Sequence, residues 1–403
     1  MPNAPTCPRD GHDQHVIVKD GIQRSDQRPR QRWRCTAPDG TYHRFLGALS
    51  VTRGGAGVCP TCERPFGPSD GPATPSRYEY LVREIATALV SIGGGASYTD
   101  AAERVRSQAW GESRQWNRKN STNIHGALVA EWLQQYGPVV LDAHAETEWP
   151  DTLVLDSTEF QHTDSWTGDK SRLFSVLFAY GYPADLTKPR MWKIAASPSD
   201  TAAHWADFLA LLTGKPRVVV CDDDDNIKAG VRQCWFKGKP VHIHSCEHHL
   251  YKRARVAMDA DGVKHDSPLH EALNVAFHSP QEWDALRDVV RVTGSPALQK
   301  WMRDKNKMMT NQLARRGEVS VYANGAIEAP IQVVREGIER RAWCFRNLAR
   351  MNLLLEMMRL RLNKVDSVDA YALLIRDHLA ATNGVAPTRR RQWDPKGTSS
   401  LRR

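Results

Sequence analysis

The stretch Thr152-Leu153-Val154-Leu155-Asp156 places an aspartate directly after a run of apolar residues. A second stretch, Val218-Val219-Val220-Cys221-Asp222, repeats this arrangement, and the two acids are 66 positions apart. Short apolar runs of this kind predict buried strands. Ligands bind at the carboxyl ends of strands in open α/β sheets, so both aspartates are candidate functional carboxylates, although a single strand-end aspartate is more often a helix or turn cap.

The segments around these stretches predict an α/β layer architecture. Further predicted strands and helices lie at 173–178, 191–196, 204–212, 226–236 and 241–245. Three strands, a helix, a strand, a helix and a strand in this order are typical of a sheet with helices packed on it. Residues 265–320 have a polar, helical pattern, and a long amphipathic, basic helix is expected to begin near Ala326 and to run through Arg350.

Two further motifs accompany the aspartates. Cys246-Glu247-His248-His249 places a cysteine and a histidine three positions apart, and Asn324-Gly325-Ala326-Ile327-Glu328 brings a glutamate 106 positions after Asp222. This combination resembles the DDE transposases of bacterial insertion sequences, most of all the Mutator type. The resemblance covers roughly residues 150–355 and implies an RNase H-like core, a mixed sheet flanked by helices, with a helical insertion before the last acid.

The resemblance also implies the chemistry. Asp156, Asp222 and Glu328 would be the catalytic residues and would hold two Mg²⁺ or Mn²⁺ ions. Such ions activate water for cleavage of the DNA end, after which the freed 3′-hydroxyl attacks target DNA. The adjacent Asp223-Asp224-Asp225 run leaves the second acid open by a position or two, and we favour Asp222 because it directly follows the predicted strand.

Two other functions fit the same residues. One is a DNA-binding regulator that has kept the fold without catalysis, against which the intact carboxylates argue. The other is an RNase H-like nuclease, which would not join the cleaved ends to target DNA. Cys246 and His249 are in addition a candidate zinc pair, and a structural hydrogen-bonding cluster near the active site fits them equally well.

The cysteines of the first 66 residues predict a zinc site. Four of the eight cysteines lie there, at Cys7, Cys35, Cys59 and Cys62, and the last two form a CxxC pair. In a reducing compartment such a cluster indicates metal binding rather than disulfides. We therefore predict a zinc-ribbon-like domain, in which His12 or His43 is an alternative to Cys35 as a ligand.

The expected partner is double-stranded DNA, because the net charge of +9 makes the surface attractive to polyanions. The expected DNA contacts are Arg30, Arg32, Trp33, Arg34, Arg335, Arg346 and Arg350. A transposase would bind the terminal repeats of its element and the target DNA as a homo-oligomer, at least a dimer.

No apolar run approaches the ~18 residues needed to span a bilayer, and the first residues lack the pattern of a secretory signal. The expected location is therefore the bacterial cytoplasm, at the nucleoid.

These expectations combine into one domain scheme. The segments are a zinc-ribbon-like domain at 1–66, a linker at 67–76, a helical, helix-turn-helix-like domain at 77–148, the first part of the RNase H-like core at 149–264, the helical insertion at 265–320, the last part of the core with the catalytic helix at 321–382, and a basic tail at 383–403.

Overall fold

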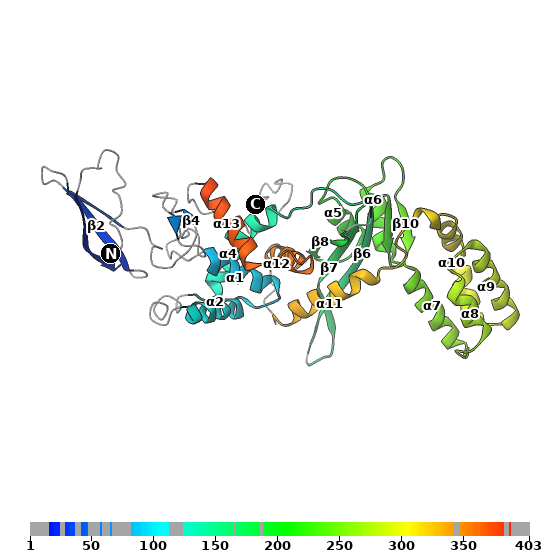
Figure 1. Cartoon of the computed structure of the whole chain (residues 1–403). Coiled ribbons are helices and arrows are strands. Elements are labelled where there is room, and N and C mark those ends of the chain that lie inside the picture. The colour runs from blue at the N-terminus through cyan, green and yellow to red at the C-terminus, as the bar shows by residue number, and fades with distance from the viewer. Residues whose placement is uncertain are drawn as a thin grey trace. The chain divides into compact units, whose positions relative to one another are not determined.

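The computed structural model of the chain is drawn in Figure 1. It describes residues 16–24, 29–36, 42–46, 57–58, 65–66, 82–112, 124–164, 166–185, 188–341, 347–382 and 387. The chain divides into two compact units. We call them the helical unit (Met1–Ala145, Gly337–Cys344 and Glu356–Trp393) and the sheet unit (Glu146–Glu336, Phe345–Leu355 and Asp394–Arg403).

The sheet unit is built on a mixed five-stranded sheet, drawn in green in Figure 1. Its strands are β6 (Thr152–Thr163), β7 (Lys170–Tyr182), β8 (Arg190–Ser197), β9 (Val218–Cys221) and β10 (His242–Ser245). Their order is β10-β9-β6-β7-β8, with β7 antiparallel to both β6 and β8, and with β9 parallel to both β6 and β10. The predicted α/β architecture of a mixed sheet flanked by helices is confirmed.

Helices α5 (Ala202–Leu209) and α6 (Asp225–Cys234) cover one face of this sheet. Leu153 and Leu155 of β6 pack there against Trp205 and other apolar side chains of the two helices. The helices approach each other closely at Gly230, where an added Cβ would lie 2.4 Å from the Cβ of Trp205. A glycine at this point of α6 is therefore required for the close packing of α5 against α6.

Alternate residues of β6 point to the opposite face, which meets α11 (Gly325–Glu339) and the start of α12 (Leu348–Leu362). Arg335 of α11 donates to the hydroxyl of Thr158 at 3.3 Å. The side-chain oxygen of Asn352 accepts a hydrogen bond from the backbone N–H of Ala196 at 2.6 Å. Asp156 lies on this second face, since it alternates with Leu153 and Leu155.

The expectation of one helix from Ala326 through Arg350 is wrong. Helix α11 ends at Glu339, and the N–H of Arg341 turns back to the carbonyl of Ile338, three residues earlier. A new helix follows, because the side chain of Asn347 accepts the N–H of Arg350 at 3.2 Å and caps α12. The apolar pattern continues across the break, which is why periodicity alone did not reveal it.

Residues 265–320 are largely helical, as their pattern predicts, and the helical segment already begins at Glu247. It consists of α7 (Glu247–Ala260), α8 (Pro268–Val275), α9 (Pro280–Thr293), α10 (Pro296–Ala314) and the short 3-10 turn η2 (Arg316–Glu318). These helices bury a core of their own around Trp283, which is 1% exposed. Asp261 holds the first turn of α10 by accepting the N–H of Ala297 at 2.9 Å.

The helical unit contains α1 (Val82–Gly93), α2 (Tyr98–Glu112) and α4 (Gly126–Asp142), which lie in the segment expected to be helical. Helix α13 (Val368–Ala381) packs on α1 and α4. Arg83 pairs with Asp369 at 2.9 Å across the α1–α13 contact. The C-terminal helix therefore belongs with the N-terminal helices, whereas the domain scheme grouped 321–382 with the sheet.

The described N-terminal strands form two small antiparallel sheets within the segment expected to be ribbon-like. One contains β1 (Val16–Arg24), β2 (Pro29–Thr36) and β3 (Tyr42–Leu46), and the other contains β4 (Gly57–Val58) and β5 (Pro65–Phe66). Over the described part of the chain, no helix is both long enough and apolar enough to cross a membrane.

Candidate functional site

The register of the sheet brings the two strand aspartates together. Leu155 of β6 pairs with Cys221 of β9, so Asp156 and Asp222 follow at the same level of the sheet. Ser245 of β10 also pairs with Cys221, which brings Cys246 to this level. Contrary to expectation, Asp156 is not at the end of its strand, because β6 continues to Thr163. The shorter strands β9 and β10 end beside Asp156, whereas β6 continues past it. The side chains of Asp156, Asp222 and Cys246 therefore lie close to the ends of β9 and β10.

A buried amide joins the two carboxylates. The Nδ2 of Asn324 donates to Asp156 Oδ2 at 3.1 Å and to Asp222 Oδ1 at 3.0 Å. Its Oδ1 accepts the thiol hydrogen of Cys246 at 3.1 Å. Asn324 is 0% exposed and directly precedes α11, so the start of this helix is tied to the strand ends. The sequence offered no signal for this bridge beyond the presence of Asn324 in the motif that ends at Glu328.

Burial and neighbouring acids raise the pKa of both strand aspartates. Burial, followed by the charge of Asp222, raises the pKa of Asp156 to about 7, against a hydrogen bond from the N–H of Ser157 that lowers it. Glu328, in the first turn of α11, contributes repulsion to the same carboxyl. Burial also raises the pKa of Asp222, whereas His249 and Arg253 oppose the increase. Acidic groups that repel one another in a partly buried site are a common setting for a divalent metal.

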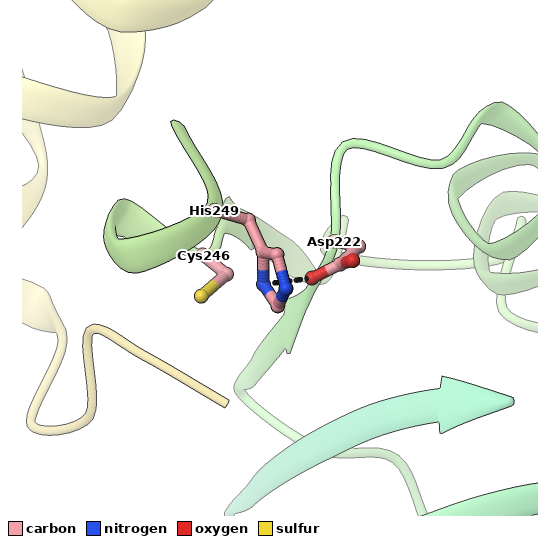
Figure 2. A group of neighbouring side chains, drawn as sticks. All are labelled: Asp222, Cys246 and His249. Atoms are coloured by element: carbon pink, nitrogen blue, oxygen red, sulfur yellow. Dashed lines mark ion pairs between the residues drawn. The ribbon is translucent and has the colours of Figure 1, made fainter. Parts of the chain in front are cut away.

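A second group of possible metal ligands shares Asp222. The ligand atoms of Asp222, Cys246 and His249 all lie within 4.8 Å of one another. Figure 2 shows the three side chains next to one another, with the ring of His249 drawn between Cys246 and Asp222; Cys246 and His249 come from the start of α7 and Asp222 from the loop after β9. His249 Nδ1 lies 2.6 Å from Asp222 Oδ1. This cluster could hold a metal ion, and it contains the cysteine and histidine that the sequence singled out.

The structure separates the roles of the four consecutive aspartates. Asp223 turns away from Asp156 and forms ion pairs with Lys228, Lys305 and Arg253, and the two lysines lower its pKa against the effect of burial. Asp224 caps α6 by accepting the N–H of Asn226 at 2.7 Å. Of the four acids, Asp222 is thus the one that shares the amide of Asn324 with Asp156.

Several predicted site residues lie elsewhere or outside the described residues. Arg335 is on α11 and binds Thr158, and Arg350 is exposed on α12, not on the helix that contains Glu328. The residues that the structure does not describe include Cys7, Cys59, Cys62 and Arg346. In β2 it does not describe the side chains of Arg30, Arg32, Trp33 and Cys35. Arg34 in the same strand is half-buried. The linker at 67–76 and, apart from Pro387, the tail from residue 383 also lie outside the described residues.

The described geometry thus offers a pair of carboxylates joined by an amide, a third acid close enough to repel one of them, and a cysteine and histidine beside the second. Oxygen donors of this kind bind divalent cations and can act on phosphate groups through them. The chain matches no protein-family model and no curated protein.

Proposed function

We propose that this chain is a DDE transposase, an enzyme that binds the ends of a DNA element and cleaves and joins DNA strands with the help of divalent metal ions. The observation that carries the proposal is the meeting of Asp156 and Asp222 at Asn324, the residue that opens the helix containing Glu328. The strands and helices also follow the order on which the resemblance to the RNase H-like core rests. We infer that the sheet unit is a core of that kind.

Asp156, Asp222 and Glu328 are the residues that would hold Mg²⁺ or Mn²⁺. The donor set fits, because all three are carboxylates and a hard cation would relieve the repulsion that raises the pKa of Asp156. Two bound ions supply an activated nucleophile and stabilise the leaving oxygen of a phosphodiester. Asn324 bonds one oxygen of each aspartate, and the other oxygen of Asp156 accepts the N–H of Ser157 at 2.7 Å but keeps a lone pair that could bind an ion.

The proposed partner is double-stranded DNA, both the terminal repeats of the element and the target, bound by at least a dimer. The net charge of +9 supports a polyanionic partner. In this proposal the helical unit and the N-terminal strands bind the repeats, with Zn²⁺ held by Cys7, Cys35, Cys59 and Cys62. The cleaved strand binds at the carboxylates of the sheet unit.

The experiment that tests the proposal is strand cleavage and joining by the full chain. The purified protein is incubated with supercoiled plasmid containing the DNA that flanks its coding region, with Mg²⁺ or Mn²⁺ and with a chelator. We expect metal-dependent nicks at the element ends and covalent joining of those ends to a second plasmid. Nicking without joining would identify a nuclease instead, and sequence-specific binding without either would identify a silent regulator.

The variant Glu328→Gln keeps the size of the side chain and removes its charge. We expect normal folding and normal DNA binding. The cleavage rate should fall by about 10²–10³-fold, because the variant lacks one ligand of a metal ion that stabilises the transition state by several kcal/mol. Glu339→Gln, at the last residue of the same helix, is the matched control and should cleave at nearly the parental rate. Parental cleavage by Glu328→Gln would show that the third acid lies elsewhere, and Glu318 and Glu336 would be tested next.

The cluster of Asp222, Cys246 and His249 is proposed to bind a zinc-like ion, since thiolate and imidazole donors favour such metals over Mg²⁺. Titration with Co²⁺, followed by the absorption of the cobalt–thiolate bond, measures this directly. We expect Cys246→Ser to bind one ion fewer per chain than the parent, whereas Cys234→Ser, at the end of α6, binds the same number. Equal stoichiometry in all three proteins would assign Cys246 and His249 to hydrogen bonding alone.

A further inference from the structure

Three cationic side chains meet the single carboxylate of Asp223, immediately beside Asp222. Lys228 of α6 binds its Oδ1, while Lys305 of α10 and Arg253 of α7 bind its Oδ2, the arginine at 3.4 Å. The Asp223 side chain is 5% exposed, so this is a built cluster in which three helices converge on one buried acid.

The charges of this cluster do not balance. All three cations pair with Asp223, Arg253 also acts on the neighbouring Asp222, and Lys228 has a further contact with the neutral sulfur of Met308. Asp304, the acid next to Lys305 in sequence, instead lines a groove with Trp235 and Arg315 on another side of α10. Three cations thus face two acids, Asp223 and Asp222, and the charge of Asp222 would be taken up by the metal ion of the proposed function.

The excess charge is open to solvent on one side. Lys228 is 10% exposed, but the side chains of Lys305 and Arg253 are 28% and 47% exposed. Arg253 also lies one helical turn after His249, which contacts Asp222, so the two side chains share a face of α7. An accessible guanidinium and an accessible ammonium are the groups that proteins use for phosphate oxygens.

We propose that Arg253 and Lys305 bind a backbone phosphate of the DNA strand, next to the phosphate that is cleaved at Asp156 and Asp222. The proposal rests on the proposed function for its ligand and names contacts that the sequence did not reveal. Asp223 holds the two cations at this position, and the exposed parts of both side chains are able to bind an anion.

The test measures DNA affinity as a function of salt for the full chain and for Arg253→Gln and Lys305→Gln. Each phosphate contact contributes about 0.9 to the slope of log K against log salt, so each variant should lose about that amount and should bind DNA about tenfold more weakly near 0.1 M salt. Lys300→Gln, an exposed lysine on the same helix α10, is the control for a general loss of charge and should change the affinity least. Thermal unfolding of each variant checks that its structure is retained.

A second arm locates the phosphate. Single neutral methylphosphonate linkages are placed at successive positions around the cleavage site, and we expect one or two positions to weaken binding by the parent but not by Arg253→Gln. Folded Arg253→Gln and Lys305→Gln with the slope and affinity of Lys300→Gln would overturn the phosphate site even if the parent cleaves DNA. Absence of metal-dependent cleavage by the parent would instead overturn the proposed function, and reduced slopes would then still establish the phosphate contacts.

Discussion

Asp156→Asn and Asp222→Asn are each expected to lower the rate of metal-dependent DNA cleavage by at least about 10³-fold, with DNA affinity nearly unchanged. Each substitution replaces a carboxylate oxygen, the donor that Mg²⁺ prefers, by a neutral amide of the same size. The strand positions are set by the backbone register and by apolar neighbours such as Leu155 and Cys221, so the sheet should form in both variants.

The matched control is Asp225→Asn, in the same acidic run but exposed at the first position of α6. Its loss should leave cleavage within about twofold of the parent, because it contacts neither Asp156 nor Asn324 among the described hydrogen bonds. Cleavage is measured on nicked plasmid in gels, and binding by titration with labelled DNA. If Asp222→Asn cleaves DNA at the parental rate while Asp225→Asn does not, Asp222 is not the second acid.

Asn324→Ala separates the bridge from the carboxylates themselves. It keeps both acids but removes the amide that joins them, so we expect a weaker apparent affinity for Mg²⁺ and a cleavage rate that partly recovers at high Mg²⁺ concentration. Asp156→Asn should show no such recovery, because it lacks a ligand. Cleavage as a function of Mg²⁺ concentration distinguishes the two variants, and an unchanged metal dependence in Asn324→Ala would contradict a positioning role for this residue.

The strands and the position of Asp222 could be predicted from the sequence because both depend on local patterns. An apolar run such as Val218-Val219-Val220-Cys221 indicates a buried strand wherever it occurs, and an acid directly after it lies at the strand end. The prediction for Asp156 was less accurate, because β6 continues past it with residues that are polar on one face and are supported by β7.

The parts that could not be predicted depend on contacts between residues far apart in the chain. Asn324 bridges two acids that lie 168 and 102 positions before it, and no local pattern indicates such a contact. The grouping of α13 with α1 and α4 has the same cause, since an amphipathic helix shows which face is buried but not which partner covers it. The contacts of Asp223 could not be predicted for the same reason, because its three cationic partners lie on three different helices, α6, α7 and α10.

Those partners make the loss of the Asp223 charge strongly destabilising. Asp223→Asn removes the carboxylate that pairs with all three cations, each of which is at least half-buried, and much of the repulsion between the cations is no longer compensated. Removal of one member of a buried ion pair typically costs about 3–5 kcal/mol, and in a unit of this size that lowers the melting temperature by roughly 6–20 °C.

Urea and thermal unfolding of Asp223→Asn and of the control Asp225→Asn measure the difference, and the control should stay within about 1 kcal/mol of the parent. The double variant with Lys305→Gln adds a sharper test, because removing one of the three cations should restore part of the stability that Asp223→Asn loses. Equal stability of Asp223→Asn and the parent would show that the three cations do not depend on this carboxylate. If Lys305→Gln does not restore any of the stability that Asp223→Asn loses, Asp223 stabilises the protein through its hydrogen bonds rather than by balancing the charge of the cations beside Asp222.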